Sequence, residues 1–235
     1  MRALILLLAA LLPSSVMAQT PAPAPAPSPL LTTAPDTVTY AISYVAVAPA
    51  SRSAASAAFK QYRDASAKEN GAIRVDVFEE IGLPGRFVVV ERWATAAAAT
   101  AHAMAAHTQR LKDALQSIRL TGYDERPYKT LNTSPMPASA GRDAVHIVTH
   151  ADFIPGGDPL ATLRRLAETS RAEKGNVRFD ILQSTLRPNH FTIVEAWQNQ
   201  AALDAHGAGA GRQFRDAVLT GTGSPVDERV LKAVD

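Results

Sequence analysis

The chain has 235 residues, of which 46% are hydrophobic and 20% charged, and its 24 Lys and Arg residues against 22 Asp and Glu residues give a formal net charge of +2. Basic and acidic residues are almost equal in number, so the chain lacks the excess of positive charge that is typical of nucleic-acid-binding proteins, and we expect no nucleic-acid partner. The sequence contains no cysteine, which excludes disulfides, thiolate metal sites and a cysteine nucleophile.

The first element in the chain is an export signal. Residues 1–18 predict a secretory signal peptide, with a positive charge at Arg2, an apolar segment and a small-residue cleavage site that ends at Ala18. The apolar segment is too short to span a bilayer. We therefore expect a mature chain that starts at Gln19, is periplasmic or secreted, and has no membrane contact after cleavage. The Pro- and Ala-rich segment 19–36 predicts an extended spacer.

Residues 37–132 predict a first folding unit with the element order βαββαβ. Its strands alternate apolar and polar residues, and its first helix carries an apolar stripe that includes Phe59 and Tyr62. The expected elements are a strand at 40–47, a helix ended by Gly71, strands at 74–79 and 87–93 around a turn at 82–85, a helix from about 96 to 118 and a short strand at 128–131.

Residues 144–235 predict a second unit of the same order. The segment 133–143, rich in Pro, Ser, Ala and Gly, is the expected linker between the units. The expected elements of the second unit are a strand at 145–151, a helix capped by Asp158 and ended by Gly175, strands at 178–183 and 191–197, a helix at 201–219 and a strand at 229–234.

The two units are copies of one sequence. The matched pairs, at a constant offset of 104 positions, include Gly71/Gly175, Phe87/Phe191, Glu91/Glu195, Trp93/Trp197 and His102/His206. A constant offset over so many positions indicates an internal duplication. The period of a strand places the Phe, Glu and Trp of each copy on one face, and the intervening residues on the other.

The glycine before the strand, the Glu-x-Trp at its end and the His on the following helix resemble the antibiotic biosynthesis monooxygenase (ABM) family of the dimeric α/β-barrel superfamily. His107 matches a second histidine of that family, whereas the second copy has Gly211 at this place. The resemblance implies an α+β fold in which each unit is a ferredoxin-like half whose sheet packs on a partner sheet. Because the Phe/Trp face would otherwise be bare, we expect the two repeats to cover these faces mutually, as an intrachain dimeric α/β barrel.

The resemblance also implies a cofactor-independent monooxygenase that acts on a small quinol or polyphenol-like aromatic molecule. Such a substrate, once deprotonated, can itself give an electron to oxygen, so no cofactor is expected. Trp93 and Phe87 would contact the aromatic ring, and His102 or His107 would handle the proton. Glu91 is a candidate base, because burial beside apolar residues would raise its pKa.

A structural role is open for each of these residues. Glu91 can pair with Arg74 on the neighbouring strand, the tryptophans can be core residues, and a helical histidine can simply be hydrogen-bonded or exposed. His102 and His107 are five positions apart on one expected helix, so they should point in different directions. We therefore expect no metal site.

The second repeat adds its own candidates. Trp197 repeats the first indole, and His146 and His150 share one face of a strand about 13 Å apart, which suits the lining of a lumen better than one ion. Because the first repeat keeps His107 and offers Tyr44, we expect it to hold the working site. The alternative is that His146 and His150 make the second repeat the working site.

Two other functions remain open from the sequence. One is a non-catalytic periplasmic protein that binds a small ligand in the same barrel. The other is haem binding or haem degradation, since related barrel haem-degrading monooxygenases resemble this chain at the Trp position. Their strand-one Asn has no convincing counterpart here. Association of the chain into a homo-oligomer is also left open.

Overall fold

The computed structural model describes residues 38–134, 140–156 and 158–234, all within one compact unit that covers residues 33–235. The expected signal peptide, the spacer and the centre of the expected linker lie outside the described residues. Within the described ranges, no helix is both long enough and apolar enough to span a membrane.

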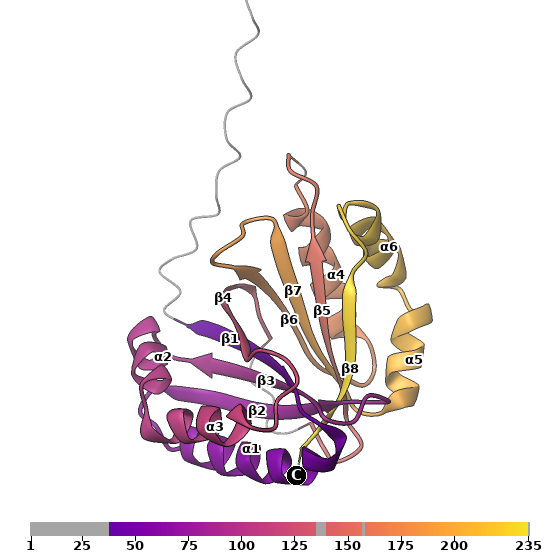
Figure 1. The fold of residues 1–235 in the computed structure, drawn as a ribbon. Coiled ribbons are helices and arrows are strands. Elements are labelled where there is room, and N and C mark those ends of the chain that lie inside the picture. Colours follow the sequence, from indigo (N-terminus) through magenta and orange to yellow (C-terminus); the bar gives the residue numbers. More distant parts are fainter. Residues whose placement is uncertain (1–37, 135–139, 157, 235) are drawn as a thin grey trace, which may run out of the picture. The chain divides into compact units, whose positions relative to one another are not determined.

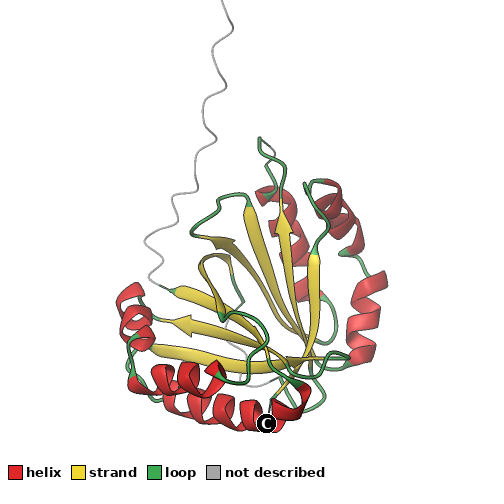
Figure 2. Cartoon of the chain, in the orientation of Figure 1, coloured by secondary structure: helices red, strands yellow, loops and turns green. Residues whose placement is uncertain are grey.

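The first repeat has the expected order of strands. Its elements are β1 (Thr39–Ala46), the 3-10 helix η1 (Pro49–Ser51), α1 (Arg52–Ser66), β2 (Ala72–Glu80), β3 (Arg86–Trp93), α2 (Ala96–Ala103), α3 (Ala106–Gln116) and β4 (Asp124–Asn132). The second repeat consists of β5 (Val145–Asp152), α4 (Leu160–Ala172), β6 (Asn176–Ser184), β7 (His190–Trp197), α5 (Gln200–Ala208), α6 (Arg212–Thr220) and β8 (Asp227–Ala233). Figure 2 shows these helices and strands.

The expectation of one long helix after the third strand of each repeat is wrong, because two short helices stand there. Thr95 caps α2 by accepting a hydrogen bond from the backbone N–H of Ala98 at 3.1 Å. The helix then ends at Ala103 with Met104 as its C-cap, and Ala105 is extended, with φ −67° and ψ 146°. Alanine is a good helix former, so tertiary contacts and not local propensity cause this break. One such contact is from Thr108 Oγ1, which donates to the carbonyl oxygen of His102 at 2.8 Å.

The eight strands close into one antiparallel barrel, which confirms the predicted intrachain assembly of the two repeats. The order around the barrel is β1-β3-β2-β8-β5-β7-β6-β4. Each repeat contributes four adjacent strands, and the two sheets join where β2 pairs with β8 and where β4 pairs with β6. Helices α1 to α3 lie outside the first sheet and α4 to α6 outside the second (Figure 1).

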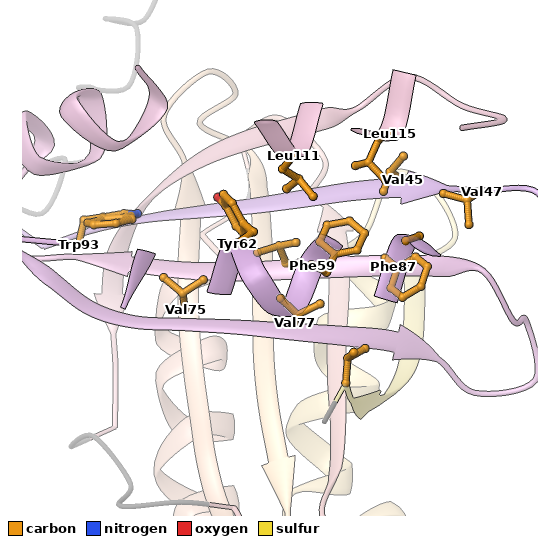
Figure 3. Close-up of a cluster of buried hydrophobic side chains, with 13 residues drawn as sticks. Val45, Val47, Phe59, Tyr62, Val75, Val77, Phe87, Trp93, Leu111 and Leu115 are labelled. Carbon is orange, nitrogen blue, oxygen red and sulfur yellow. The ribbon is translucent and has the colours of Figure 1, made fainter. Parts of the chain in front are cut away.

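The predicted assignment of the strand faces is reversed. Phe87 and Trp93 point away from the barrel interior, toward the helices of the first repeat (Figure 3). Val89 belongs to the same cluster, in which the rings of Phe59 and Phe87 are 4.9 Å apart. The interior is filled instead by aliphatic side chains and tyrosines, including Tyr40, Ile42, Val88, Val90, Leu182, Val194 and Leu231. Both faces of β3 are apolar, so the alternation alone does not say which face is inside. On this strand Val88 and Val90 face the lumen, and the larger Phe87 and Trp93 face the helices.

Two buried polar clusters interrupt this apolar interior and connect the repeats. Near the start of β1, Tyr40 Oη donates to Asp180 Oδ2 at 3.0 Å, and Arg178 Nε donates to the same oxygen at 2.6 Å. Near its end, Tyr44 Oη lies 2.5 Å from His150 Nε2. Burial lowers the pKa of His150 to about 3, so this ring is neutral.

Candidate functional site

A cavity of about 530 Å³ lies between the sheet and the helices of the second repeat. Its volume is within the range of small-molecule sites. Apolar side chains from β5, β6, β7, β8, α4, α5 and α6 form most of its wall, among them Ile147, Leu166, Phe179, Ile193, Leu203 and Val218. The charged or titratable residues in this wall are Glu195, Asp204, His206, Arg215 and Glu228.

Glu195 is the buried acid of this cavity. It sits on β7 and is 7% exposed, and its Oε2 accepts a hydrogen bond from Trp197 Nε1 at 2.9 Å. Burial raises the pKa of Glu195 to about 7, because the hydrogen bond from Trp197 and the charge of Arg215 offset only part of the lost hydration. A carboxyl group with this pKa can accept or release a proton at neutral pH.

His206 lies between Glu195 and a second acid, Glu173. Its Nε2 lies 3.7 Å from Glu195 Oε2, and its Nδ1 lies 2.7 Å from Glu173 Oε2. The imidazole stacks on Trp197 with ring centroids 4.4 Å apart. Burial lowers the pKa of His206 more strongly than the partner Glu173 raises it. The Glu173 side chain is 15% exposed, so the series Glu195, His206, Glu173 leads from the cavity toward solvent.

Arg215 supplies a cation at the cavity wall. It lies on α6, and its Nη2 donates to the carbonyl oxygen of Gly207 at 2.7 Å, which fixes the guanidinium. The corresponding position of the first repeat is Leu111, a buried core residue. The cavity therefore combines apolar walls with an acid of raised pKa, Glu195, and a guanidinium group, that of Arg215, held in place by a hydrogen bond.

The first repeat has the same acid in a different environment. Tyr62 Oη donates to Glu91 Oε1, and Trp93 Nε1 donates to Glu91 Oε2 at 3.1 Å. His102 Nε2 is 3.5 Å from Glu91 Oε1. Burial by itself would raise the pKa of Glu91, but His102, Tyr62 and Trp93 together outweigh it and lower that pKa. Glu91 is thus held ionised, as a structural acceptor.

The ring of Tyr62 fills the place that the cavity occupies in the second repeat. It lies between Trp93 and Phe59 in the core of the first repeat (Figure 3). A space of about 100 Å³ is left beside Tyr62. At the position of Tyr62 the second repeat has Leu166, which lines the larger cavity. At this place between sheet and helices, the second repeat therefore has the larger space, whereas a separate pocket of about 460 Å³ in the first repeat is lined by Tyr44 and Phe87.

The structure separates several residues that the sequence analysis grouped together. Trp93 and Phe87 lie at opposite ends of β3, about 20 Å apart along the strand, too far to contact one aromatic ring. The alternative pairing of Glu91 with Arg74 is wrong: Arg74 Nε donates to Asp76 Oδ2 at 2.7 Å, on the other face of the sheet.

The remaining candidates lie in the barrel lumen, apart from the helix-side cavity. Tyr44 and His150 come from different repeats and meet there, as described above. His146 packs on Phe78, with ring centroids 4.5 Å apart, and burial lowers its pKa to about 4. Trp197 does lie at the cavity site, through its contacts with Glu195 and His206.

The prediction that His102 and His107 diverge is wrong. The break between α2 and α3 turns His107 back, so that His107 Nε2 lies 2.8 Å and His102 Nδ1 lies 2.5 Å from the same oxygen, Glu69 Oε1. Sequence reasoning missed Glu69 and its counterpart Glu173. The signal was present, because these two acids also obey the offset of the duplication.

Comparison with known proteins agrees with this architecture. The family model described as antibiotic biosynthesis monooxygenase matches residues 39–114 and 158–218, one segment in each repeat. A protein named "Putative monooxygenase YcnE" from Bacillus subtilis is 34% identical over 47 residues, which are 20% of this chain and 50% of that protein. The match thus spans about half the length of this curated relative.

Solved structures with both halves of the barrel are similar over most of this chain. The structure of a "Putative monooxygenase" from Fusobacterium nucleatum has a TM-score of 0.77 and 11% identity, over 85% of this chain and 93% of the other. A "putative monooxygenase" from Lactobacillus acidophilus has a TM-score of 0.71 and 15% identity, over 85% and 95%. At such low identities, the TM-scores show a shared fold alone. The family model, by contrast, matches more than half of the chain. The chain therefore belongs to the antibiotic biosynthesis monooxygenase family.

Proposed function

We propose that the second repeat is a monooxygenase site for a small phenolic or quinol-type aromatic molecule, with Glu195 as the base. The observation that carries this proposal is the position of Glu195 in an apolar cavity of about 530 Å³, where its pKa is raised to about 7. A base works best when its pKa is near the working pH. The phenolic group of such a substrate is the proton donor that a buried carboxylate can serve.

The chemistry needs no group beyond substrate and oxygen. Loss of the phenolic proton to Glu195 leaves an electron-rich phenolate, which can pass an electron to O2 and then combine with the reduced oxygen. In the balanced reaction, a hydroquinone and O2 give a hydroxyquinone and water. One oxygen atom enters the ring, the other leaves as water, and the substrate supplies all four electrons.

The other cavity residues support these steps. Arg215, fixed by the carbonyl oxygen of Gly207, favours the phenolate over the neutral phenol. His206 and Glu173 offer a path by which the proton on Glu195 reaches solvent. The apolar wall keeps water away from the reduced oxygen intermediate. In this proposal, the first repeat is the structural half, because Tyr62 and its hydrogen bond to Glu91 occupy the equivalent space.

Oxygen uptake with a panel of hydroquinones and naphthols tests the proposal, alongside calorimetric measurement of ligand binding. We expect Glu195→Gln to bind an aromatic ligand but to lose oxygen uptake by roughly 10²- to 10⁴-fold. Glu91→Gln is the matched control in the other repeat, and we expect it to keep turnover while losing stability. Equal loss of turnover in both variants contradicts the assignment of the second repeat, and binding without uptake by the wild type indicates a non-catalytic ligand-binding protein.

A further inference from the structure

We propose that Glu69, His102 and His107 form a binding site for a divalent transition-metal ion, with zinc as the expected occupant. Their ligating atoms, Glu69 Oε1, His102 Nδ1 and His107 Nε2, all lie within 4.8 Å of one another. The carboxylate oxygen is 2.5 Å from the first nitrogen and 2.8 Å from the second. Among the residues that the structure describes, no other set of three His, Cys, Asp or Glu side chains brings its ligand atoms this close together.

The chemical types suit zinc. Zinc binds imidazole nitrogen and carboxylate oxygen at about 2.0–2.2 Å, and three protein ligands with one open position are typical of its reactive sites. In a tetrahedral arrangement, bonds of this length place the ligand atoms about 3.4 Å apart. The carboxylate oxygen therefore needs to move away from each ring nitrogen by less than about 1 Å to admit the ion, while the two nitrogens already lie within 4.8 Å of each other.

One of the three ligands is already held in position. The other ring nitrogen of His102, Nε2, lies 2.7 Å from Tyr62 Oη, and the imidazole stacks on Trp93 with centroids 4.4 Å apart. An outer partner that fixes the ring and its tautomer is the usual companion of a metal-bound histidine. Tyr62 in turn donates to Glu91, so the orientation of His102 rests on a fully buried series of groups.

The proposed site is accessible from the surface. The side chains of Glu69 and His107 are 21% and 15% exposed, whereas that of His102 is 4% exposed. An ion can therefore reach the two outer ligands first and complete its coordination on the buried one. The fourth position would take water.

The three ligands come from three separate elements. Glu69 follows the end of α1, His102 lies on α2 and His107 lies on α3. A bound ion would connect these elements across the break at Ala105. Because the ion binds a preformed arrangement of the folded chain, its binding must raise the stability of the first repeat.

The second repeat provides an internal comparison. Glu173 and His206 repeat two of the ligands, with a contact of 2.7 Å between carboxylate oxygen and Nδ1 against 2.5 Å in the first repeat. Gly211 stands where the third ligand would be, and its backbone N–H donates to Glu173 Oε1 at 3.1 Å. A Cβ atom built on Gly211 would meet its nearest neighbours, Glu173 Oε1 and Ser170 Oγ, at 3.3 Å, a tight but adjustable fit. The duplication has thus left one repeat with three ligands and the other with two.

Titration of Zn²⁺ into untagged, chelator-treated full-length protein tests the inference, by calorimetry for stoichiometry and by the melting temperature for stabilisation. We expect one ion per chain and a higher melting temperature. His107→Gln should weaken this binding by at least tenfold, while its metal-free melting temperature shows that the variant is folded. His206→Gln should leave the stoichiometry at one. Gly211→His should raise it to two, because it adds the third ligand to the second repeat.

Absence of saturable binding to the wild type overturns the proposal, and so does unchanged affinity in His107→Gln. Co²⁺ offers an independent measurement, since a four-coordinate ion gives visible absorption bands that the wild type should show and His107→Gln should lack. These readouts do not depend on any enzymatic activity, so they stand apart from the test of Glu195.

Discussion

Tyr62 and Leu166 occupy the same position on the first helix of the two repeats, and the glutamates beside them, Glu91 and Glu195, have pKa values shifted in opposite directions. Tyr62 donates a hydrogen bond to Glu91 and helps to lower its pKa. Leu166 offers no such donor and lines an open cavity, where burial raises the pKa of Glu195. Together with His102, whose contribution is larger, the Tyr62 hydroxyl thus distinguishes a structural carboxylate from one that can exchange protons near neutrality.

We expect the Leu166→Tyr substitution to close the cavity and convert the second repeat to the state of the first. The new ring would fill the space, and its hydroxyl would hydrogen-bond Glu195 and lower its pKa. Ligand affinity and turnover should both be lost without loss of melting temperature. The reciprocal Tyr62→Leu should lower the free energy of unfolding by roughly 1–3 kcal/mol, since the buried Glu91 loses a donor. Denaturant unfolding of both variants checks this pair, and stabilisation by Tyr62→Leu would contradict it.

The activity of the second repeat should depend on pH through Glu195. The deprotonated carboxylate is the base, so kcat/KM with a phenolic substrate should fall as the pH drops below about 7. A pH-rate profile on the wild type gives the apparent pKa. A profile that stays flat down to pH 5 would exclude Glu195 as the base, because most of the carboxyl groups would then be protonated.

The same group should make stability depend on pH. Its pKa is about 7 in the folded chain against 4.5 for the unperturbed group, so the folded state holds its proton longer than the unfolded state. The stability that the protonated Glu195 contributes to the folded state is fully present below pH 4.5 and is lost as the pH rises to about 7. At 1.36 kcal/mol per pKa unit this amounts to about 3 kcal/mol. Glu195→Gln lacks this cost, so its melting temperature relative to wild type should rise between pH 5 and pH 8; an unchanged difference would contradict the raised pKa.

Gly71 and Gly175, which directly precede the second strand of each repeat instead of ending its first helix as the sequence predicted, should be sensitive to substitution. Gly71 has φ +85°, and a Cβ atom there would lie 2.6 Å from the Cβ of Ala98. Gly82 has a similar φ of +82° with open space around it, which makes it a matched control. Gly82→Ala should cost about 1–2 kcal/mol for its backbone conformation, and Gly71→Ala should cost about 1–3 kcal/mol more for the overlap. Urea denaturation of the two variants measures the difference, and equal losses would show that the overlap relaxes.

The ion pair inside the barrel should be costly to break. Asp180 accepts from Arg178 and Tyr40, and all three are buried. Asp180→Asn leaves the Arg178 charge with Asp76, 3.7 Å away, so we expect a loss of about 3–5 kcal/mol in the free energy of unfolding. Asp124→Asn removes the partner of Arg126 at a half-exposed pair and should cost less than about 1 kcal/mol. Similar losses in the two variants, measured by urea denaturation, would contradict this account.

The sequence predicted the architecture because its strongest signals are long-range and regular. The duplication, the strand alternation and the Glu-x-Trp pattern together determined the order of elements and the barrel. The faces of β3 were not predictable in the same way, because both Phe87 and Val88 are apolar and only the packed layers decide between them. Tertiary contacts of Thr108 and His107, which no local propensity reveals, set the helix break.

The cavity of the second repeat could not be predicted from the sequence for a related reason. The motif residues Glu195 and Trp197 are matched by Glu91 and Trp93 in the first repeat, so they do not indicate which repeat has the cavity. The difference lies in Leu166, an ordinary core residue by type, whose importance appears only when its neighbours are known to leave space. A sequence comparison of the two repeats directed at differences, and not at matches, would have pointed to this position.

The pairing of β2 with β8 and of β4 with β6 has an evolutionary consequence. In a barrel made of two identical chains, every substitution appears in both halves at once, so a cavity cannot be filled in one half and kept in the other. Joining the halves in one polypeptide removes that coupling and makes assembly of this barrel independent of protein concentration. Each half can then change by itself. One half can have Tyr62, whose ring fills the space between sheet and helices, while the other has Leu166 and an open cavity.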